Sequence, residues 1–219
     1  MRRKIENGKV VKYIPLDYFS NLEVETAKEL DSLIINKIKD VLKKLKQAGL
    51  LENKKHDLAF WYLLGKGINE LIESSEFKKL EIPEYDLKGV FDGIENAARI
   101  ELHIFENLKE SERQNTFLRN HIYRAYKLAQ FPEGYVKKVG SWDTWREFLE
   151  RPIFDRDPTL LRKLLDLYLK KYNKQIERKT AREIIKLVNK KLKGYNTRYM
   201  PSDVLDKIIE EIIDTVGQY

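Results

Sequence analysis

The chain has 219 residues, of which 42% are hydrophobic and none is cysteine. A chain of this length and composition can bury a core without disulfides, so disorder is not expected. The lack of cysteine excludes a disulfide framework, a thiolate metal site and a cysteine nucleophile, and it fits a reducing compartment. No apolar run approaches the roughly 20 residues that cross a bilayer, so we expect a cytoplasmic protein without a membrane partner.

Positive charge is concentrated in the C-terminal third. Charged residues make up 35% of the chain, and the net charge is +7. Lys and Glu are abundant, which is typical of thermophile surfaces with ion-pair networks, so the charge density alone indicates no ligand. Between Leu160 and Arg198, however, thirteen Lys and Arg stand against three acids, a local charge of +10. Such an asymmetry is typical of a surface that faces phosphates or acidic lipids.

The N-terminal part begins with a weakly alternating segment at residues 9–16. Because this segment contains Pro15, it predicts at most a short edge strand or an extended arm. Thr26-Ala-Lys-Glu29 has the pattern of a capping box and predicts a helix that continues to Gly49.

A second helix is predicted from about residue 54 to residue 74. It contains Gly65 and Gly67, each of which weakens a helix by roughly 1 kcal/mol. These glycines therefore indicate a close approach of another element or a kink.

Residues 82–93 contain Pro83, Gly89 and Gly93 and are predicted to form a connecting loop. Amphipathic helices are expected to follow it over residues 94–108 and 113–130.

Four further helices are predicted in the C-terminal part. Asp157-Pro158 is a strong start signal, and Thr180-Ala-Arg-Glu183 is a second capping box. Ser202 is expected to cap the last helix. The predicted ranges are 141–150, 157–172, 180–194 and 202–217.

These elements predict an all-α protein, a multi-helix bundle of seven or eight helices with a basic C-terminal helical segment. Composition suggests three parts, although one continuous domain is the alternative. They are an N-terminal arm and helical hairpin (1–82), central helices with a Trp-rich segment (83–155) and the basic C-terminal helical segment (156–219).

The helix after Thr180 carries the strongest functional signal. Arg182, Lys186, Lys190 and Lys193 follow one another at spacings of four, four and three, which places them on one face. The apolar face consists of Ile184, Ile185, Val188 and Leu192. The predicted nucleic-acid-binding residues are Lys174, Arg178, Lys179, Arg182, Lys186, Lys190, Lys193 and Arg198. A solvated thermophilic face and an acidic protein partner are the alternatives.

Aromatic residues surround this segment and could stack on bases or pack beneath lysine stems. They are Tyr168, Tyr172, Tyr195 and Tyr199. The three tryptophans lie among large apolar residues, so we expect Trp61, Trp142 and Trp145 in the core, with base stacking as the alternative.

Catalytic patterns are weak. Glu177-Arg-Lys179, with Asp157 or Asp166, matches half of a PD-(D/E)XK nuclease motif, but Glu52-Asn-Lys54 matches equally. That chemistry needs a carboxylate and a lysine side by side on a strand, whereas Glu177 lies in helical sequence.

No cofactor and no metal site are expected. His56, His103 and His121 are remote from one another in the sequence, so they do not form a ligand set by spacing.

Three stretches each combine aromatic residues with glycine or with basic residues. They are Trp61 to Glu70, Asn115 to Phe131, and Ser141-Trp142 with Trp145, Arg146, Leu149 and Arg162. Together they resemble the N-terminal helical domain of YhcG-like proteins, over about residues 57 to 165. In that family the domain precedes a PD-(D/E)XK nuclease domain. The resemblance implies DNA recognition in a restriction or mobile-element setting, without nuclease activity from these residues.

The sequence thus predicts a non-catalytic nucleic-acid-binding protein that contacts phosphates through a basic helical face, with DNA favoured over RNA. The alternative is a helical scaffold subunit of a larger defence or viral nucleoprotein complex, with other protein subunits as partners. A third interpretation is a nuclease-associated specificity domain.

Overall fold

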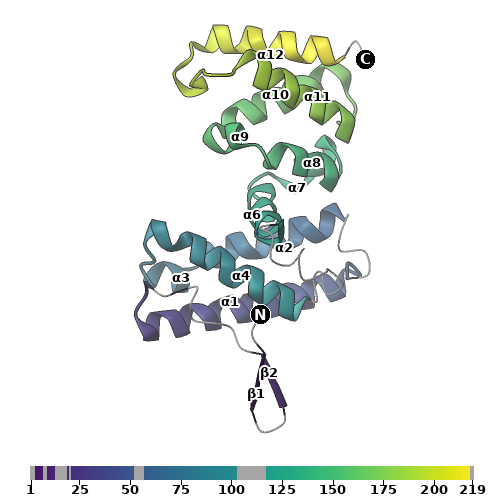
Figure 1. The fold of residues 1–219 in the computed structure, drawn as a ribbon. Coiled ribbons are helices and arrows are strands. Elements are labelled where there is room, and N and C mark those ends of the chain that lie inside the picture. Colours follow the sequence, from purple (N-terminus) through teal and green to yellow (C-terminus); the bar gives the residue numbers. More distant parts are fainter. Residues whose placement is uncertain are drawn as a thin grey trace. The chain divides into compact units, whose positions relative to one another are not determined.

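The computed structural model describes residues 3–6, 9–12, 19, 21–51, 57–102 and 117–217. For residues 3–6, 9–12, 85 and 117–120, only the backbone is described. The chain divides into two compact units, Met1–Gln130 and Phe131–Tyr219 (Figure 1).

Unit 1 consists of helices and a short hairpin. Strands β1 (Arg3–Glu6) and β2 (Lys9–Lys12) pair antiparallel, with Arg3 opposite Lys12. The short strand expected within residues 9–16 is thus present, and Pro15 lies outside the described residues. The helices are α1 (Val24–Gln47), α2 (Leu58–Ile72), α3 (Ser75–Lys79), the 3-10 turn η2 (Glu84–Asp86), α4 (Leu87–Glu101) and α6 (Phe117–Leu128).

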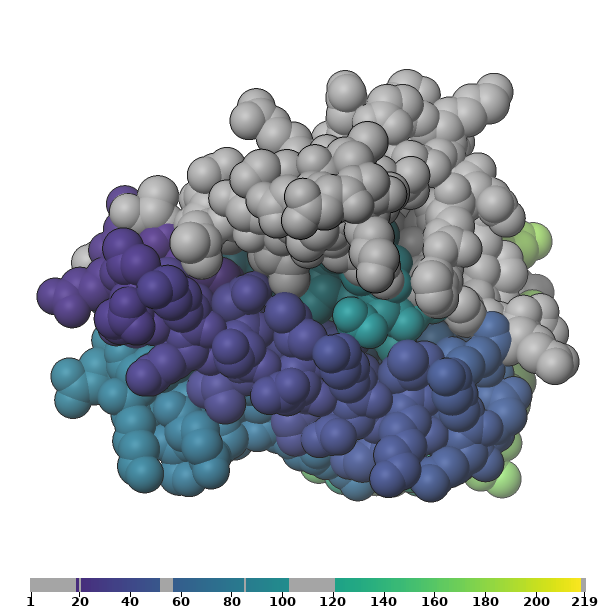
Figure 2. All heavy atoms as spheres, turned by 90° about the horizontal axis from the view of Figure 1, so that it is seen from below, coloured from purple at the N-terminus to yellow at the C-terminus, as the bar shows by residue number. Residues whose placement is uncertain are grey.

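Helix α1 provides one wall of the core of unit 1. Its apolar positions recur at helical spacing and face α2 and α4, while its other side is exposed, as the purple to indigo surface shows (Figure 2). The buried residues of α1 are Ala27, Leu30, Ile34, Ile38, Val41 and Leu45.

Two glycines let the helices of unit 1 approach closely. A Cβ atom on Gly65 would lie 1.8 Å from the carbonyl oxygen of Ala125 in α6, and one on Gly67 would lie 2.2 Å from Cγ2 of Val41. Asn69 secures the same contact, because its amide donates to the carbonyl oxygens of Gly65 at 3.0 Å and of Tyr126 at 2.9 Å. The close approach expected at these glycines is confirmed.

Gly65→Ala should therefore destabilise unit 1 although alanine favours helices. The added methyl group collides with a backbone oxygen that cannot rotate away, so we expect a loss of about 2 to 3 kcal/mol in denaturant unfolding. Gly134→Ala is the control, because no atom lies within 4 Å of its would-be Cβ. Equal stability of both variants would contradict the proposed packing of α2 on α6.

Unit 2 is entirely helical. Helix α11 packs against α8 and α12, and α10 packs against α9 and α12. Its elements are α7 (Glu133–Val139), α8 (Trp142–Leu149), α9 (Pro152–Arg156), α10 (Pro158–Tyr172), α11 (Arg178–Lys191), the 3-10 turn η3 (Thr197–Tyr199) and α12 (Ser202–Val216).

The all-α class is confirmed, with the hairpin as the one sheet in the described residues. The described part of the chain contains eleven α-helices against the seven or eight expected, because the short helices α3, α7 and α9 were not anticipated. No described helix combines the length and the apolar character that a membrane span requires.

The loop predicted at residues 82–93 is wrong beyond Asp86, because α4 begins at Leu87. Gly93 serves close packing and not a turn, since a Cβ there would lie 2.8 Å from Cζ of Phe19. Val90 and Ile94 are fully buried, which draws this segment into a helix.

Both predicted capping boxes are also wrong. Helix α1 follows Glu23 and α11 follows Glu177, and neither residue makes a side-chain capping bond. Ser202 is the first residue of α12 and does not cap it. By contrast, Asp157 caps α10 as expected, with its carboxylate accepting from the amide of Leu160 at 3.1 Å.

The division between Gln130 and Phe131 differs from the boundaries expected after residues 82 and 155. Helix α4, which follows the first expected boundary, packs on α1, so residues 83–101 belong with unit 1. Helix α9, which spans the second, packs on α8 and α10 and belongs to unit 2.

All three tryptophans are fully buried, as expected. In unit 2, Trp145 packs against Phe131 with ring centroids 5.0 Å apart, and its indole N–H donates to the carbonyl oxygen of Val136 at 2.9 Å. Trp145 thereby ties α8 to α7.

Trp145→Ala should lower the stability of unit 2 by about 3 to 5 kcal/mol, because a large cavity forms and a buried carbonyl loses its donor. Thermal unfolding followed by circular dichroism measures the loss. An unchanged melting temperature combined with lost ligand binding would instead assign Trp145 to a binding surface.

Candidate nucleic-acid interface

Helix α11 is amphipathic in the way its sequence predicts. Ile184, Ile185, Val188 and Leu192 are buried, and the opposite side of the helix faces solvent. The contact of α11 with α8 then places the basic residues of its first turns beside the acidic face of α8.

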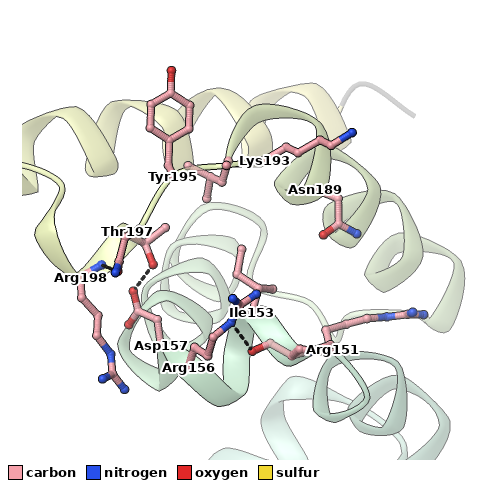
Figure 3. A pocket seen from close by; sticks show the side chains of 13 residues that line it. Arg151, Ile153, Arg156, Asp157, Asn189, Lys193, Tyr195, Thr197 and Arg198 are labelled. Atoms are coloured by element: carbon pink, nitrogen blue, oxygen red, sulfur yellow. Dashed lines mark hydrogen bonds between the residues drawn. The ribbon is translucent and has the colours of Figure 1, made fainter.

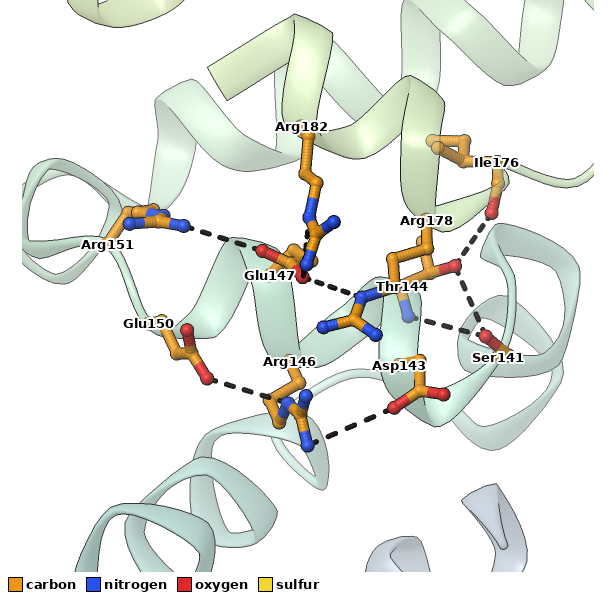
Figure 4. Close-up of polar contacts among 10 residues, drawn as sticks. All are labelled: Ser141, Asp143, Thr144, Arg146, Glu147, Glu150, Arg151, Ile176, Arg178 and Arg182. Atoms are coloured by element: carbon orange, nitrogen blue, oxygen red, sulfur yellow. Dashed lines mark hydrogen bonds and ion pairs between the residues drawn. The ribbon is translucent and has the colours of Figure 1, made fainter. Parts of the chain in front are cut away.

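Glu147 on α8 lies at the centre of this contact. Glu147 is 4% exposed, and its carboxylate faces three arginines from two other parts of unit 2 (Figure 4). The Oε1 atom of Glu147 accepts from Nε of Arg178 at 2.7 Å and from Nε of Arg182 at 3.0 Å. Its Oε2 atom lies 3.4 Å from a terminal nitrogen of Arg151. One buried carboxylate therefore fixes three guanidinium groups.

The contacts in this cluster favour the charged forms of Glu147 and Arg178. Burial alone would raise the pKa of Glu147, but the hydrogen bonds and charges of Arg178 and Arg182 outweigh it and hold that pKa below its ordinary 4.5. Reciprocally, the hydrogen bond to Glu147 raises the pKa of Arg178.

The start of α11 is held in place by a second set of contacts. Ser141 caps α8 by accepting from the amide of Thr144 at 3.3 Å, and the Thr144 hydroxyl donates to the carbonyl oxygen of Ile176 at 2.9 Å (Figure 4). A Cβ on Gly140 would lie 2.7 Å from that same oxygen, so the turn into α8 has no room for a side chain. The segment leading into α11 is thus attached to α8.

Two adjoining hollows open along this side of α11, and we call them together the basic groove. The shallow hollow, of about 570 Å³, is lined by Glu147, Glu150, Arg151, Arg178, Arg182, Ile185, Lys186 and Asn189. The end hollow, of about 900 Å³, surrounds the C-terminal end of α11 (Figure 3). It is lined by Arg151, Pro152, Ile153, Arg156, Asp157, Asn189, Leu192 and the residues 193–198. Arg151 and Asn189 line both hollows.

The lining of the groove contains seven cationic residues and three acidic ones. The acids are engaged within the protein: Glu147 by its arginines, and Glu150 by Arg146 at 3.5 Å. Asp157 uses Oδ1 to cap α10 and accepts from the Thr197 hydroxyl at 2.6 Å through Oδ2. The groove therefore presents an excess of positive charge.

Five of the eight predicted binding residues line the groove: Arg178, Arg182, Lys186, Lys193 and Arg198. Lys174, Lys179 and Lys190 are exposed outside its lining.

At the fourth turn of α11 the groove side is occupied by Asn189 and not by Lys190, since neighbouring residues lie about 100° apart around a helix. Arg151 and Arg156 were missed, because they lie in and beside the short helix α9, which local sequence did not reveal. The only sequence feature close to these two arginines was Asp157-Pro158, and it predicts the start of α10 rather than a binding residue.

The aromatic residues divide into two groups. Tyr168 is buried, and Tyr172 donates to the carbonyl oxygen of Ile213 at 3.0 Å, so both belong to the core of unit 2. Tyr195 and Tyr199 are 65% and 86% exposed, and only these two present rings for a ligand.

The two aspartates considered for nuclease chemistry have structural partners, and Glu177 stands at the start of a helix. Asp157 is a buried helix cap, Asp166 accepts from the Tyr135 hydroxyl at 2.7 Å, and Glu177 precedes the first turn of α11. Glu52, Lys54, His56 and His103 lie outside the described residues, and His121 is buried in α6. In the described ranges no group of three or more His, Asp or Glu could hold a metal ion.

A protein family defined by sequence matches residues 92–212, more than half of the chain and the whole of the basic groove. Its description is a family of unknown function, DUF6339. The chain belongs to this family. Neither the curated proteins nor the solved structures include a match.

Glu147→Gln should destabilise unit 2 by about 1 to 3 kcal/mol at pH 7, because three guanidinium groups lose a charged acceptor. The pKa of Glu147 is lowered in the folded protein. Glu147 therefore adds to the free energy of unfolding at pH values above its unfolded pKa, and this stabilisation is lost as the pH falls through the folded pKa. The free energy of unfolding, measured with urea, should therefore fall less between pH 7 and pH 3 in the variant than in the unmodified protein. Glu133→Gln is the control, because its pair with Lys137 is exposed.

Proposed function

We propose that unit 2 is a non-catalytic nucleic-acid-binding domain that grips backbone phosphates in the basic groove, with DNA favoured over RNA. The observation that carries this proposal is the groove itself, in which seven cations surround hollows whose acids are engaged within the protein. Phosphate contacts of this kind supply most of the affinity of sequence-independent binding.

The Glu147 cluster supports the proposal because it orients arginines without using all their donors. A guanidinium has five N–H donors, and the bonds to Glu147 leave several of them on Arg178 and Arg182 for another acceptor. The side chains of these two arginines are 41% and 57% exposed, so the remaining donors reach the groove. A preoriented guanidinium loses less conformational entropy when it binds a phosphate.

Ion pairing elsewhere in unit 2 argues against a merely solvated surface. On the other side of α10 and α11, lysines pair with the acidic helix α12: Lys163 with Asp206, Lys171 with Asp214 and Lys191 with Glu211. Within the described residues, Arg156, Lys193 and Arg198 form no such pair. These three unpaired cations lie together around one hollow, as expected for a phosphate-binding site.

A scaffold subunit of a larger defence or viral nucleoprotein complex is the second candidate, favoured by the exposed side chains of Tyr199 and Val204, which are 86% and 42% exposed. A nuclease-associated specificity domain, as the resemblance to YhcG-like proteins implies, is the third. The scaffold requires its complex for binding, whereas the proposed domain binds nucleic acid by itself.

Lys186 and Lys193 provide the direct test. If both neutralise phosphates, replacing them together by Ala should weaken binding to all sequences alike and reduce the slope of log K against log salt by about 2. The measurement is a fluorescence titration of duplex DNA at several salt concentrations, repeated with RNA.

Lys179→Ala with Lys190→Ala is the matched control, because both residues are exposed on α11 outside the lining of the groove and remove the same charge. Equal losses in the two double variants would reject the groove as the binding site. Absence of salt-dependent binding by the unmodified protein would reject the proposed function.

A further inference from the structure

The end hollow differs from the shallow hollow in size and in lining. It is larger, about 900 Å³ against about 570 Å³, and more enclosed. Its cations are Arg151, Arg156, Lys193 and Arg198, and its lining also includes the apolar side chains of Pro152, Ile153 and Leu192. The size and the mixture of apolar and polar groups are those of a small-ligand site.

The chain holds the end hollow in shape. Asp157 joins the start of α10 to Thr197 in η3, which fastens the 194–201 connection against α10 (Figure 3). Within that connection, the Asn196 side chain accepts from the amide of Arg198 at 3.3 Å. On the facing side, Nε of Arg156 donates to the carbonyl oxygen of Pro152 at 3.4 Å. These contacts hold cations from residues 151–156 and 193–198 around the end hollow.

The charges that line the end hollow indicate which ligand it would bind. Asp157 is the acid in its lining, and both its oxygens accept hydrogen bonds from the protein. An internal phosphodiester carries one negative charge, whereas a phosphomonoester at neutral pH carries about 1.5 to 2 and has three strong acceptor oxygens. Arg156, Lys193 and Arg198 have no carboxylate partner among the described residues, and three such cations match the charge of the monoester better.

We propose that the end hollow binds the terminal nucleotide of a strand through its phosphomonoester. The shallow hollow, which shares Arg151 and Asn189 with it, holds the adjacent phosphates along α11, and the apolar lining contacts the sugar and base. This proposal rests on the proposed function and specifies which part of the nucleic acid the groove takes at its end.

The test compares single-stranded DNA of one sequence, labelled internally, that differs only in its ends. The forms carry a 5′-phosphate, a 3′-phosphate, two hydroxyls, or no ends because the strand is circular. We expect one phosphorylated form to bind about tenfold more tightly than the hydroxyl form, as for a charge-assisted hydrogen bond, and the circle to bind like the hydroxyl form. Thymidine monophosphate as competitor distinguishes a free nucleotide from a strand end: it should remove the gain only at high concentration.

Two variants separate the end hollow from the rest of the groove. Arg156→Ala with Arg198→Ala should abolish the gain from the terminal phosphate, while Lys186→Ala should weaken all strands and keep the gain. Lys138→Ala with Lys170→Ala controls for lost charge, because both lysines are exposed outside the groove. Thermal unfolding verifies that each variant is folded.

Equal, salt-dependent binding of phosphorylated, hydroxyl and circular strands would overturn this inference and leave the proposed function intact. A gain that survives in Arg156→Ala with Arg198→Ala would also overturn it. Failure of every strand and of thymidine monophosphate to bind would overturn this inference, and absence of salt-dependent binding to duplex DNA as well would overturn both proposals.

Discussion

The carboxylate of Glu147 is the constraint on which the basic side of unit 2 depends. A buried charge is tolerated when it is paired and hydrogen-bonded, and Glu147 reaches this state through Arg178, Arg182 and Arg151. Satisfying it requires α8, α11 and the turn before α9 to come together. The same requirement sets the guanidinium groups along a common hollow, so the arrangement that stabilises the fold also orients the cations.

The remaining charge of unit 2 is divided between two sides. Acidic residues of α12 pair with lysines of α10 and α11, which neutralises one side and contributes little stability per exposed pair. The other side keeps cations around the end hollow, where the nearby Asp157 is occupied with helix capping and with Thr197. Under the proposed function, this local concentration of positive charge would steer a polyanion toward the groove more effectively than an evenly spread charge.

Much of this fold follows from local sequence, and much of the groove does not. The buried tryptophans, the close approach at Gly65 and the Asp157 cap depend on residue size and short-range hydrogen bonding, and all three were predictable. The capping boxes failed because packing overrides local propensity: Arg178, two residues before Thr180, is already helical and bonded to Glu147.

The groove could be predicted only in part. Periodicity predicted Arg182, Lys186, Lys190 and Lys193 on one face of the helix, but in the structure Asn189 and not Lys190 lines the groove. Arg151 and Arg156 escaped prediction because they line the same hollow as residues some forty positions later, a proximity that no local pattern encodes. The counter-ion Glu147 pairs with arginines 31 and 35 residues away and was hidden for the same reason.

Lysine footprinting tests the central claim, that nucleic acid lies in the basic groove, most directly. The full chain is acetylated under limiting conditions with and without duplex DNA, and modification of each lysine is quantified by mass spectrometry. Lys186 and Lys193 should be protected, while Lys138, Lys170, Lys179 and Lys190, which are also exposed but lie outside the groove, should react as in the free protein. Protection of Lys179 and Lys190 with unchanged reactivity of Lys186 and Lys193 would contradict the account.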